Sequence, residues 1–198
     1  MRKLHVLRRL LGLGYSRNVV RAQVKAGVIA RERWAEEVSA AHLLLAAIRE
    51  PAPVLARVCS ELGVSSEAVA KEIGLTLPPA RLDPIPAARS CLTPSLDYKE
   101  VLWGARGDAA QCGAEYVGPE HLLLHAMQTE SAVGEILRRR FPPAEELRAL
   151  VGAISRQTAV DQADAPRELG PIGQLLLLFT RWLVRQNERR IKRQSRRS

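Results

Sequence analysis

The sequence predicts an all-α protein of two tandem, pseudo-symmetric four-helix repeats packed as one domain, followed by a C-terminal amphipathic helix. The first observation is an internal repeat: residues 16–58 align with residues 95–137 at a constant shift of 79, with twelve identical pairs. The second is that apolar residues recur every three or four positions in each copy, which is the helical period. The third is that no segment alternates apolar and polar residues with the period of two typical of strands.

Composition limits both the core and the setting. Of 198 residues, 46% are hydrophobic but only 4% are aromatic, so the core must be aliphatic. Cys59, Cys91 and Cys112 are far apart and form no CxxC, which excludes a four-thiolate zinc site within one chain and suits a reducing cytosol. No run reaches 18 apolar residues, so we expect a cytoplasmic protein that is at most peripheral on a membrane.

The positive charge is concentrated at the two ends of the chain. The net charge is +9, yet residues 32–180 hold fourteen basic and twenty acidic residues and are therefore negative. Residues 1–31 hold eight basic residues and no acid, and residues 181–198 hold eight basic residues and one acid. A basic surface for an anionic partner would therefore belong to the ends.

Start and stop signals place the helices of the second copy. Residues 93–95 (Thr-Pro-Ser) predict a helix with Thr93 as cap and Pro94 as first residue, and Gly113 ends it. Residues 118–120 (Gly-Pro-Glu) open the next helix, a shorter helix spans about 131–139, and a fourth begins after Pro142-Pro143.

The first copy follows the same plan, with Ser39 capping its second helix. Four prolines break the chain between the copies, and a polar stretch follows the second copy. We therefore expect a basic N-terminal segment, repeat one, a proline-rich linker, repeat two, a polar linker, and an apolar and basic C-terminal helix with its tail: residues 1–15, 16–73, 74–93, 94–154, 155–171 and 172–198.

Two motifs connect these repeats to a known family. Residues 116–124 read YVGPEHLLL, residues 38–45 read VSAAHLLL, and Leu62-Gly63-Val64 precedes the last helix of copy one. The chain resembles the Clp N-terminal repeat domain, the tandem four-helix module at the front of ClpA- and ClpC-type AAA+ unfoldases. The resemblance covers about residues 16–154, and residues 141–143 (Phe-Pro-Pro) depart from the family pattern.

The resemblance implies a non-enzymatic module of the Clp chaperone and proteolysis system that binds Clp ATPase or protease subunits, adaptors or substrate proteins. In some ClpC-type domains, the glutamate of this motif receives phosphorylated arginine; Glu120 matches it, whereas copy one has Ala41. The expected peptide- or partner-binding residues lie at the start of the repeated helix: Tyr116, Gly118, Pro119, Glu120 and His121.

No catalytic residue, cofactor or nucleotide site is expected. The phosphate-binding pattern G-x-x-x-x-G-K-[ST] does not occur, so we expect a free-standing repeat domain and not a complete unfoldase. His121 and His125 have the i, i+4 spacing of metal ligands, but His121 recurs as His42, where Ala46 takes the place of His125. This recurrence favours a hydrogen-bonded packing role. Glu120 could also have a purely structural role, because an acidic side chain at a helix N-terminus interacts favourably with the positive end of the helix dipole.

The C-terminal segment carries the alternative function. It combines an apolar stripe with arginines, and three roles remain open: docking on the repeats, lying on an anionic membrane surface, or anchoring a partner. Its expected contact residues are Phe179, Trp182, Arg185, Arg189 and Arg190. Basic tails also bind nucleic acid without sequence preference, but the acidic body and scarce aromatics argue against a dedicated nucleic-acid reader.

Overall fold

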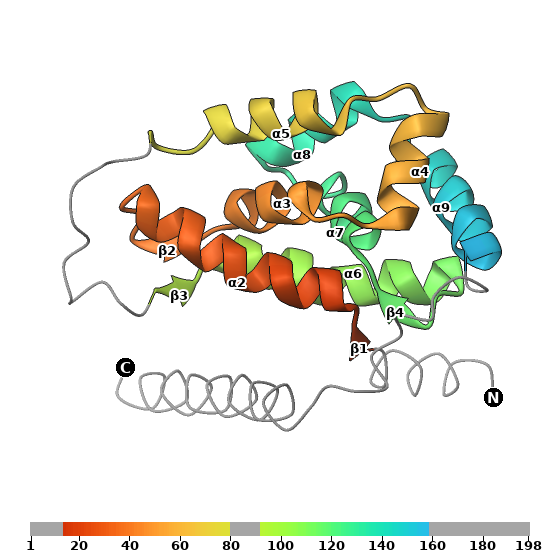
Figure 1. The fold of residues 1–198 in the computed structure, drawn as a ribbon, viewed down its shortest axis with the longest axis horizontal. Helices are drawn as coiled ribbons and strands as arrows, with labels where there is room; N and C mark the ends of the chain where they lie inside the picture. The colour runs from red at the N-terminus through yellow and green to blue at the C-terminus, as the bar shows by residue number, and fades with distance from the viewer. Residues whose placement is uncertain (1–13, 80–91, 159–198) are drawn as a thin grey trace. The chain divides into compact units, whose positions relative to one another are not determined.

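The structure is a computed structural model that describes residues 14–79 and 92–158 (Figure 1). These residues form eight helices, as predicted for an all-α fold. The helices are α2 (Arg17–Glu32), α3 (Ala40–Arg49), α4 (Pro53–Glu61), α5 (Ser66–Leu75), α6 (Leu96–Cys112), α7 (Pro119–Ala126), α8 (Ala132–Arg140) and α9 (Ala144–Thr158).

The helices confirm the tandem repeat. Helices α2, α3 and α4 begin 79 residues before α6, α7 and α8, and α5 begins 78 residues before α9. Cap positions agree with the sequence signals: Ser39 and Gly118 cap α3 and α7, and Gly113 ends α6 with a positive φ of 73°. Glycine is favoured there because side chains with a Cβ rarely adopt that backbone conformation.

Four two-residue strands link the repeats, and the sequence did not predict them. They are β1 (Gly14–Tyr15), β2 (Glu37–Val38), β3 (Thr93–Pro94) and β4 (Tyr116–Val117). Strand β1 pairs in parallel with β4 and β2 with β3, so each repeat bonds to the other. Two residues are too few to show an alternating pattern. Each strand leads directly into an N-cap residue that also has extended backbone angles.

The strand pairing is itself symmetric. Gly14 pairs with Tyr116, and Thr93 pairs with Glu37; the second pair is the first displaced by 79 in opposite directions. The two repeats are thus related by a pseudo-twofold exchange of equivalent segments.

The structure differs from several predicted boundaries; α9, for example, continues to Thr158, beyond residue 154 where repeat two was expected to end. The linker expected over 74–93 is too long at both ends, because α5 continues to Leu75 and Thr93–Pro94 form β3. The helix expected to start at Pro94 starts at Leu96, because Ser95 is the N-cap and its Oγ accepts a hydrogen bond from the Tyr98 N–H at 3.4 Å. Pro94 therefore belongs to the extended segment that precedes the N-cap, and it is not part of the first helical turn.

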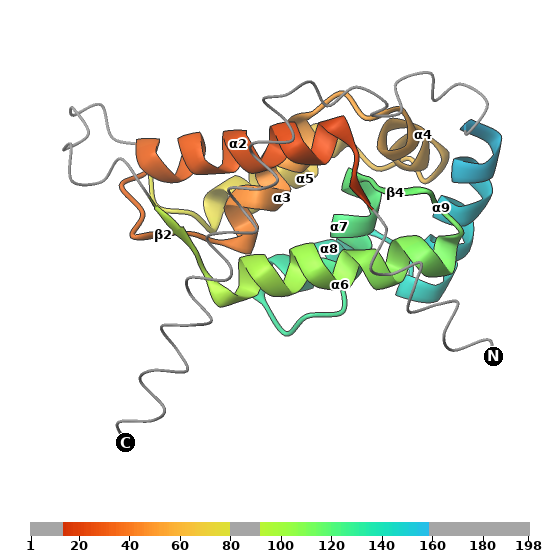
Figure 2. The same ribbon diagram turned by 90° about the horizontal axis from the view of Figure 1, so that it is seen from below.

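The two leucine-rich helices, α3 and α7, form the centre of the core. They contact each other, and Figures 1 and 2 show them between α2 and α6 on one side and α5 and α8 on the other. The triplets at 43–45 and 122–124 are at most 2% exposed. The core is aliphatic as predicted, with Tyr98 and Phe141 as its buried aromatic side chains in the described residues.

Candidate functional site

The predicted binding residues gather where β4 runs into α7. Strand β4 holds Tyr116, Gly118 caps the helix, and Pro119 is its first residue, a position where the missing N–H costs nothing. Tyr116 is half-buried, whereas Gly118, Pro119, Glu120 and His121 are buried. The structure therefore brings all five together but turns most of them inward.

Glu120 folds back over the start of its own helix. A Cβ on Gly118 would overlap the Glu120 carboxylate, so glycine leaves the room in which that carboxylate lies. Its Oε1 is 3.2 Å from His121 Nδ1, and only 6% of the residue is exposed. A carboxylate held near a helix N-terminus is stabilised by the positive end of the helix dipole.

The recurring histidine is a capping residue. The Gly118 N–H donates to His121 Nδ1 at 2.9 Å, and in copy one the Ser39 N–H donates to His42 Nδ1 at 3.1 Å. Each histidine occupies the third helical position, from which its ring reaches back to the N-cap backbone. The predicted role as a hydrogen-bonded packing residue is confirmed for both.

The two equivalent histidines differ in electrostatics. Burial and the Arg33 guanidinium lower the pKa of His42 from an ordinary 6.5 to about 4. Burial also disfavours an imidazolium at His121, but the Glu120 carboxylate and Cys112 outweigh it and raise the pKa of His121 to about 9. The Gly118 hydrogen bond needs an unprotonated Nδ1, whereas the carboxylate favours a proton at that same atom, so the two interactions compete at His121.

Replacing Glu120 with alanine should make copy two behave like copy one, where Ala41 stands at the same position. We expect Glu120→Ala to lower the pKa of His121 towards that of His42, because burial is then opposed by Cys112 without the carboxylate, which is the largest of the groups that raise this pKa. The measurement is a titration of both imidazoles by NMR, with His42 as the internal control. An unchanged His121 pKa in a folded variant would contradict the assignment to the carboxylate.

The same shifts fix the sign of the pH dependence of stability. The raised pKa of His121 contributes stability that is complete below pH 6.5 and is lost as pH rises through about 9. The lowered pKa of His42 contributes stability that is present above pH 6.5 and is lost as pH falls towards about 4.

A second polar cluster, which sequence reasoning missed, lies in copy two. The buried Asp108 on α6 accepts hydrogen bonds at its two oxygens: Oδ2 is 3.0 Å from His125 Nδ1, and Oδ1 is 3.1 Å from Gln128 Nε2 and 3.0 Å from Arg148 Nη2. Arg148 Nη1 also lies 2.7 Å from Glu145. Burial raises the pKa of Asp108, but these hydrogen bonds lower it more, so the net shift is downward. The cluster ties α6, α7 and α9 together.

The i, i+4 histidines serve different partners. His121 Nδ1 accepts from a backbone N–H, while His125 pairs with the carboxylate of α6. Within residues 14–79 and 92–158, no group of three or more metal-ligating side chains is assembled. Cys59 and Cys112 are buried free thiols, as predicted, and Cys91 lies outside the described residues.

The residues of the alternative function lie outside the described part of the chain: Phe179, Trp182, Arg185, Arg189 and Arg190. A membrane or partner contact through them therefore stays a prediction. Among the helices that the structure describes, none is both long and apolar enough to span a membrane.

Known structures share this fold. A structure from preliminary investigations of a malarial protein secretion system is 21% identical, with a TM-score of 0.60 over 74% of this chain and 97% of that one. The N-domain of ClpV from Vibrio cholerae is 19% identical, with a TM-score of 0.55 over 76% and 90%. The Hsp104 N-terminal domain from Candida albicans is 18% identical, with a TM-score of 0.54 over 70% and 89%.

Sequence comparison gives the family. No curated protein matches the chain significantly as a whole-sequence relative. The profile of the Clp repeat (R) N-terminal domain matches residues 15–140, which include helices α2 to α8 and both leucine triplets. Since this match covers more than half of the 198 residues, the chain belongs to the Clp repeat N-terminal domain family.

Proposed function

We propose that this chain is a non-enzymatic protein-binding module of a Clp unfoldase–protease system, acting as an adaptor, an accessory subunit or a substrate receptor. The observation that carries the proposal is the family match across both repeats. The Clp N-terminal domain is a substrate- and adaptor-binding module of Clp ATPases and is not catalytic by itself.

The geometry supports a rigid platform. Besides the paired strands, Asp97 on α6 accepts a hydrogen bond from the Ala40 N–H at the start of α3 at 3.0 Å, and Arg140 on α8 pairs with Glu72 on α5. These contacts join repeat one to repeat two on opposite sides of the core. The helix starts and loops of such a platform are already ordered, so a partner can bind them without a further loss of conformational entropy.

The partner docks over the β4–α7 junction in this proposal. Tyr116 is half-buried there and offers an aromatic contact at the surface. Glu120 would receive a guanidinium only after rotating out of its buried position over Gly118 and away from His121. Recognition of a phosphorylated arginine at Glu120 would therefore release the histidine from its carboxylate.

The experiment is a pull-down of purified Clp ATPase and peptidase subunits by the full chain. We expect capture by the wild type and weakened capture by Glu120→Ala. Glu115→Ala is the matched control, because Glu115 is an exposed acid just before β4. Failure of the wild type to retain any Clp subunit would contradict the module role. A folded Glu120→Ala variant with unchanged capture would remove Glu120 from the binding site.

A further inference from the structure

A groove lies between the end of α3 and the first half of α5, away from the β4–α7 junction. Its volume is about 570 Å³, within the range of sites that hold a small ligand or a few peptide side chains. It is lined by Ile48, Arg49, Ser66, Glu67, Ala70 and Lys71.

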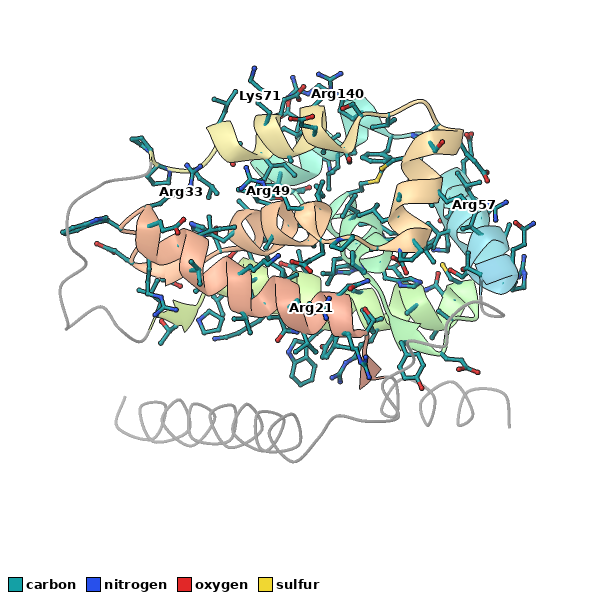
Figure 3. All side chains as sticks on the ribbon, in the orientation of Figure 1. Arg21, Arg33, Arg49, Arg57, Lys71 and Arg140 are labelled. Atoms are coloured by element: carbon teal, nitrogen blue, oxygen red, sulfur yellow. The ribbon has the colours of Figure 1, made fainter. Side chains whose placement is uncertain are left out.

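The groove carries two cations without partners. Arg49 and Lys71 are exposed, and neither makes a hydrogen bond or an ion pair with any residue in the described part of the chain. Figure 3 labels Arg49 on α3 and Lys71 on α5. By contrast, Arg57 and Arg140 each pair with a glutamate. Glu67 is the single acid of the lining, so the groove has a positive excess.

The other repeat carries different side chains at the positions that line this groove. At the shift of 78 that relates α5 to α9, Ala70 corresponds to Arg148 and Glu67 corresponds to Glu145. In copy two the Arg148 side chain lies 2.7 Å from Glu145 and 3.0 Å from Asp108 on α6. In copy one the same position holds Ala70, which lines the groove and brings no charge to it.

The other repeat also shows what the groove lacks. In copy two the buried Asp108 receives Arg148 and Gln128, and Gln128 is the counterpart of Arg49 at the shift of 79. The counterpart of Asp108 in copy one is Ile29, which supplies no acceptor. The copy-two cation Arg148 thus has an internal carboxylate partner, whereas copy one offers no such carboxylate to Arg49 and Lys71 at the equivalent position.

We propose that the α3–α5 groove binds an acidic peptide segment of a partner protein. A carboxylate of the segment lies between Arg49 and Lys71, and an adjacent apolar side chain contacts Ile48 and Ala70. Charge complementarity selects the segment, and the groove gives its side chains a place to be buried. This inference rests on the proposed role as a protein-binding module and names the chemistry of one partner surface.

The test is fluorescence anisotropy of the full chain with a labelled octapeptide of alternating glutamate and leucine, against a matched lysine–leucine peptide. We expect the acidic peptide to bind more tightly, and the Arg49→Glu/Lys71→Glu variant to bind it at least about tenfold more weakly. The control is Arg17→Glu/Arg21→Glu, which makes the same charge change at two exposed positions of α2 and should stay within about twofold of the wild type.

A third variant separates the groove from general attraction. Ala70→Arg adds a positive charge but places a long side chain at a position that lines the groove, so we expect it to weaken binding of the acidic peptide. Circular dichroism and thermal melting establish that each variant is folded. Tighter binding by Ala70→Arg, equal loss in both charge-reversed variants, or no preference of the wild type for the acidic peptide would overturn the proposal.

The peptide assay tests the groove assignment and the Clp pull-down tests the module role, so one of these proposals can be wrong while the other stands. If the wild type captures Clp subunits but ignores the acidic peptide, the groove assignment is wrong and the module role stands. If the peptide results follow the expected pattern but no Clp subunit is captured, the groove assignment stands and the Clp role is wrong.

Discussion

Asp108→Ala is expected to lower the free energy of unfolding by about 3 kcal/mol, because it removes the buried acceptor of three side chains and leaves Arg148 only the exposed Glu145 carboxylate as an ion-pair partner. The Asp108 side chain is 4% exposed and the Arg148 side chain is 15% exposed. After the substitution, Arg148, His125 and Gln128 lose their common acceptor while α9 still holds the guanidinium near the core. Urea denaturation followed by circular dichroism measures the loss.

A double-mutant cycle isolates the interaction. Arg148→Ala should lower the free energy of unfolding much less in the Asp108→Ala background than in the wild type. In the wild type it leaves the Asp108 carboxylate without its cation, whereas in the Asp108→Ala background that carboxylate is absent. The matched control is Asp97→Ala, whose carboxylate accepts from one backbone N–H in a partly buried setting and should cost about 1 kcal/mol. Equal costs for the two aspartates would show that the copy-two cluster does not hold its helices together.

Much of the fold was predictable because its determinants are local. A cap residue and the helix that it starts are neighbours in sequence, so Ser39, Gly113 and Gly118 could be placed correctly without a structure. The repeated histidine was predicted to be a packing residue from its recurrence alone. The capping bond that it makes spans three residues, and a bond this local is repeated whenever its sequence is repeated.

The missed features are those that depend on distant residues. Asp108 sits among the apolar positions of α6, and its partners His125, Gln128 and Arg148 lie 17, 20 and 40 residues away. No pattern in a single sequence joins them. Comparing the repeats gives a signal that was present but not used: Asp108 replaces Ile29, which marks a charge at a position that copy one keeps apolar.

Burial of the candidate site was also beyond sequence reasoning. The motif around Glu120 groups five candidate residues in one segment, and the structure places that segment at the β4–α7 junction. Whether a carboxylate points outward or folds over its own helix cap depends on side-chain rotamers and on the neighbouring strand. The pairing of β1 with β4 covers this junction, and two-residue strands leave no pattern from which that cover could be inferred.

Gly134→Ala is expected to destabilise the domain by about 3 kcal/mol, because the added methyl group meets rigid backbone. A Cβ at this position would lie 2.5 Å from the Thr129 carbonyl oxygen and 2.6 Å from that of Ala126. The Ala126 carbonyl ends α7 and the Thr129 carbonyl lies in the turn after it, where Arg138 donates to the Thr129 oxygen at 2.8 Å and holds it in place. The first turn of α8 would therefore have to move away from α7. Thermal and urea unfolding measure the cost.

Gly107→Ala is the matched control for the same chemical change. Gly107 lies inside α6, and a Cβ there would have no neighbour within 4 Å. Alanine should stabilise that helix by about 0.5–1 kcal/mol, since it restricts the unfolded backbone and favours the helical state. The two substitutions are thus expected to have opposite signs. If Gly134→Ala is instead as stable as the wild type, the junction between α7 and α8 adjusts freely, and the close approach of the two helices does not depend on glycine.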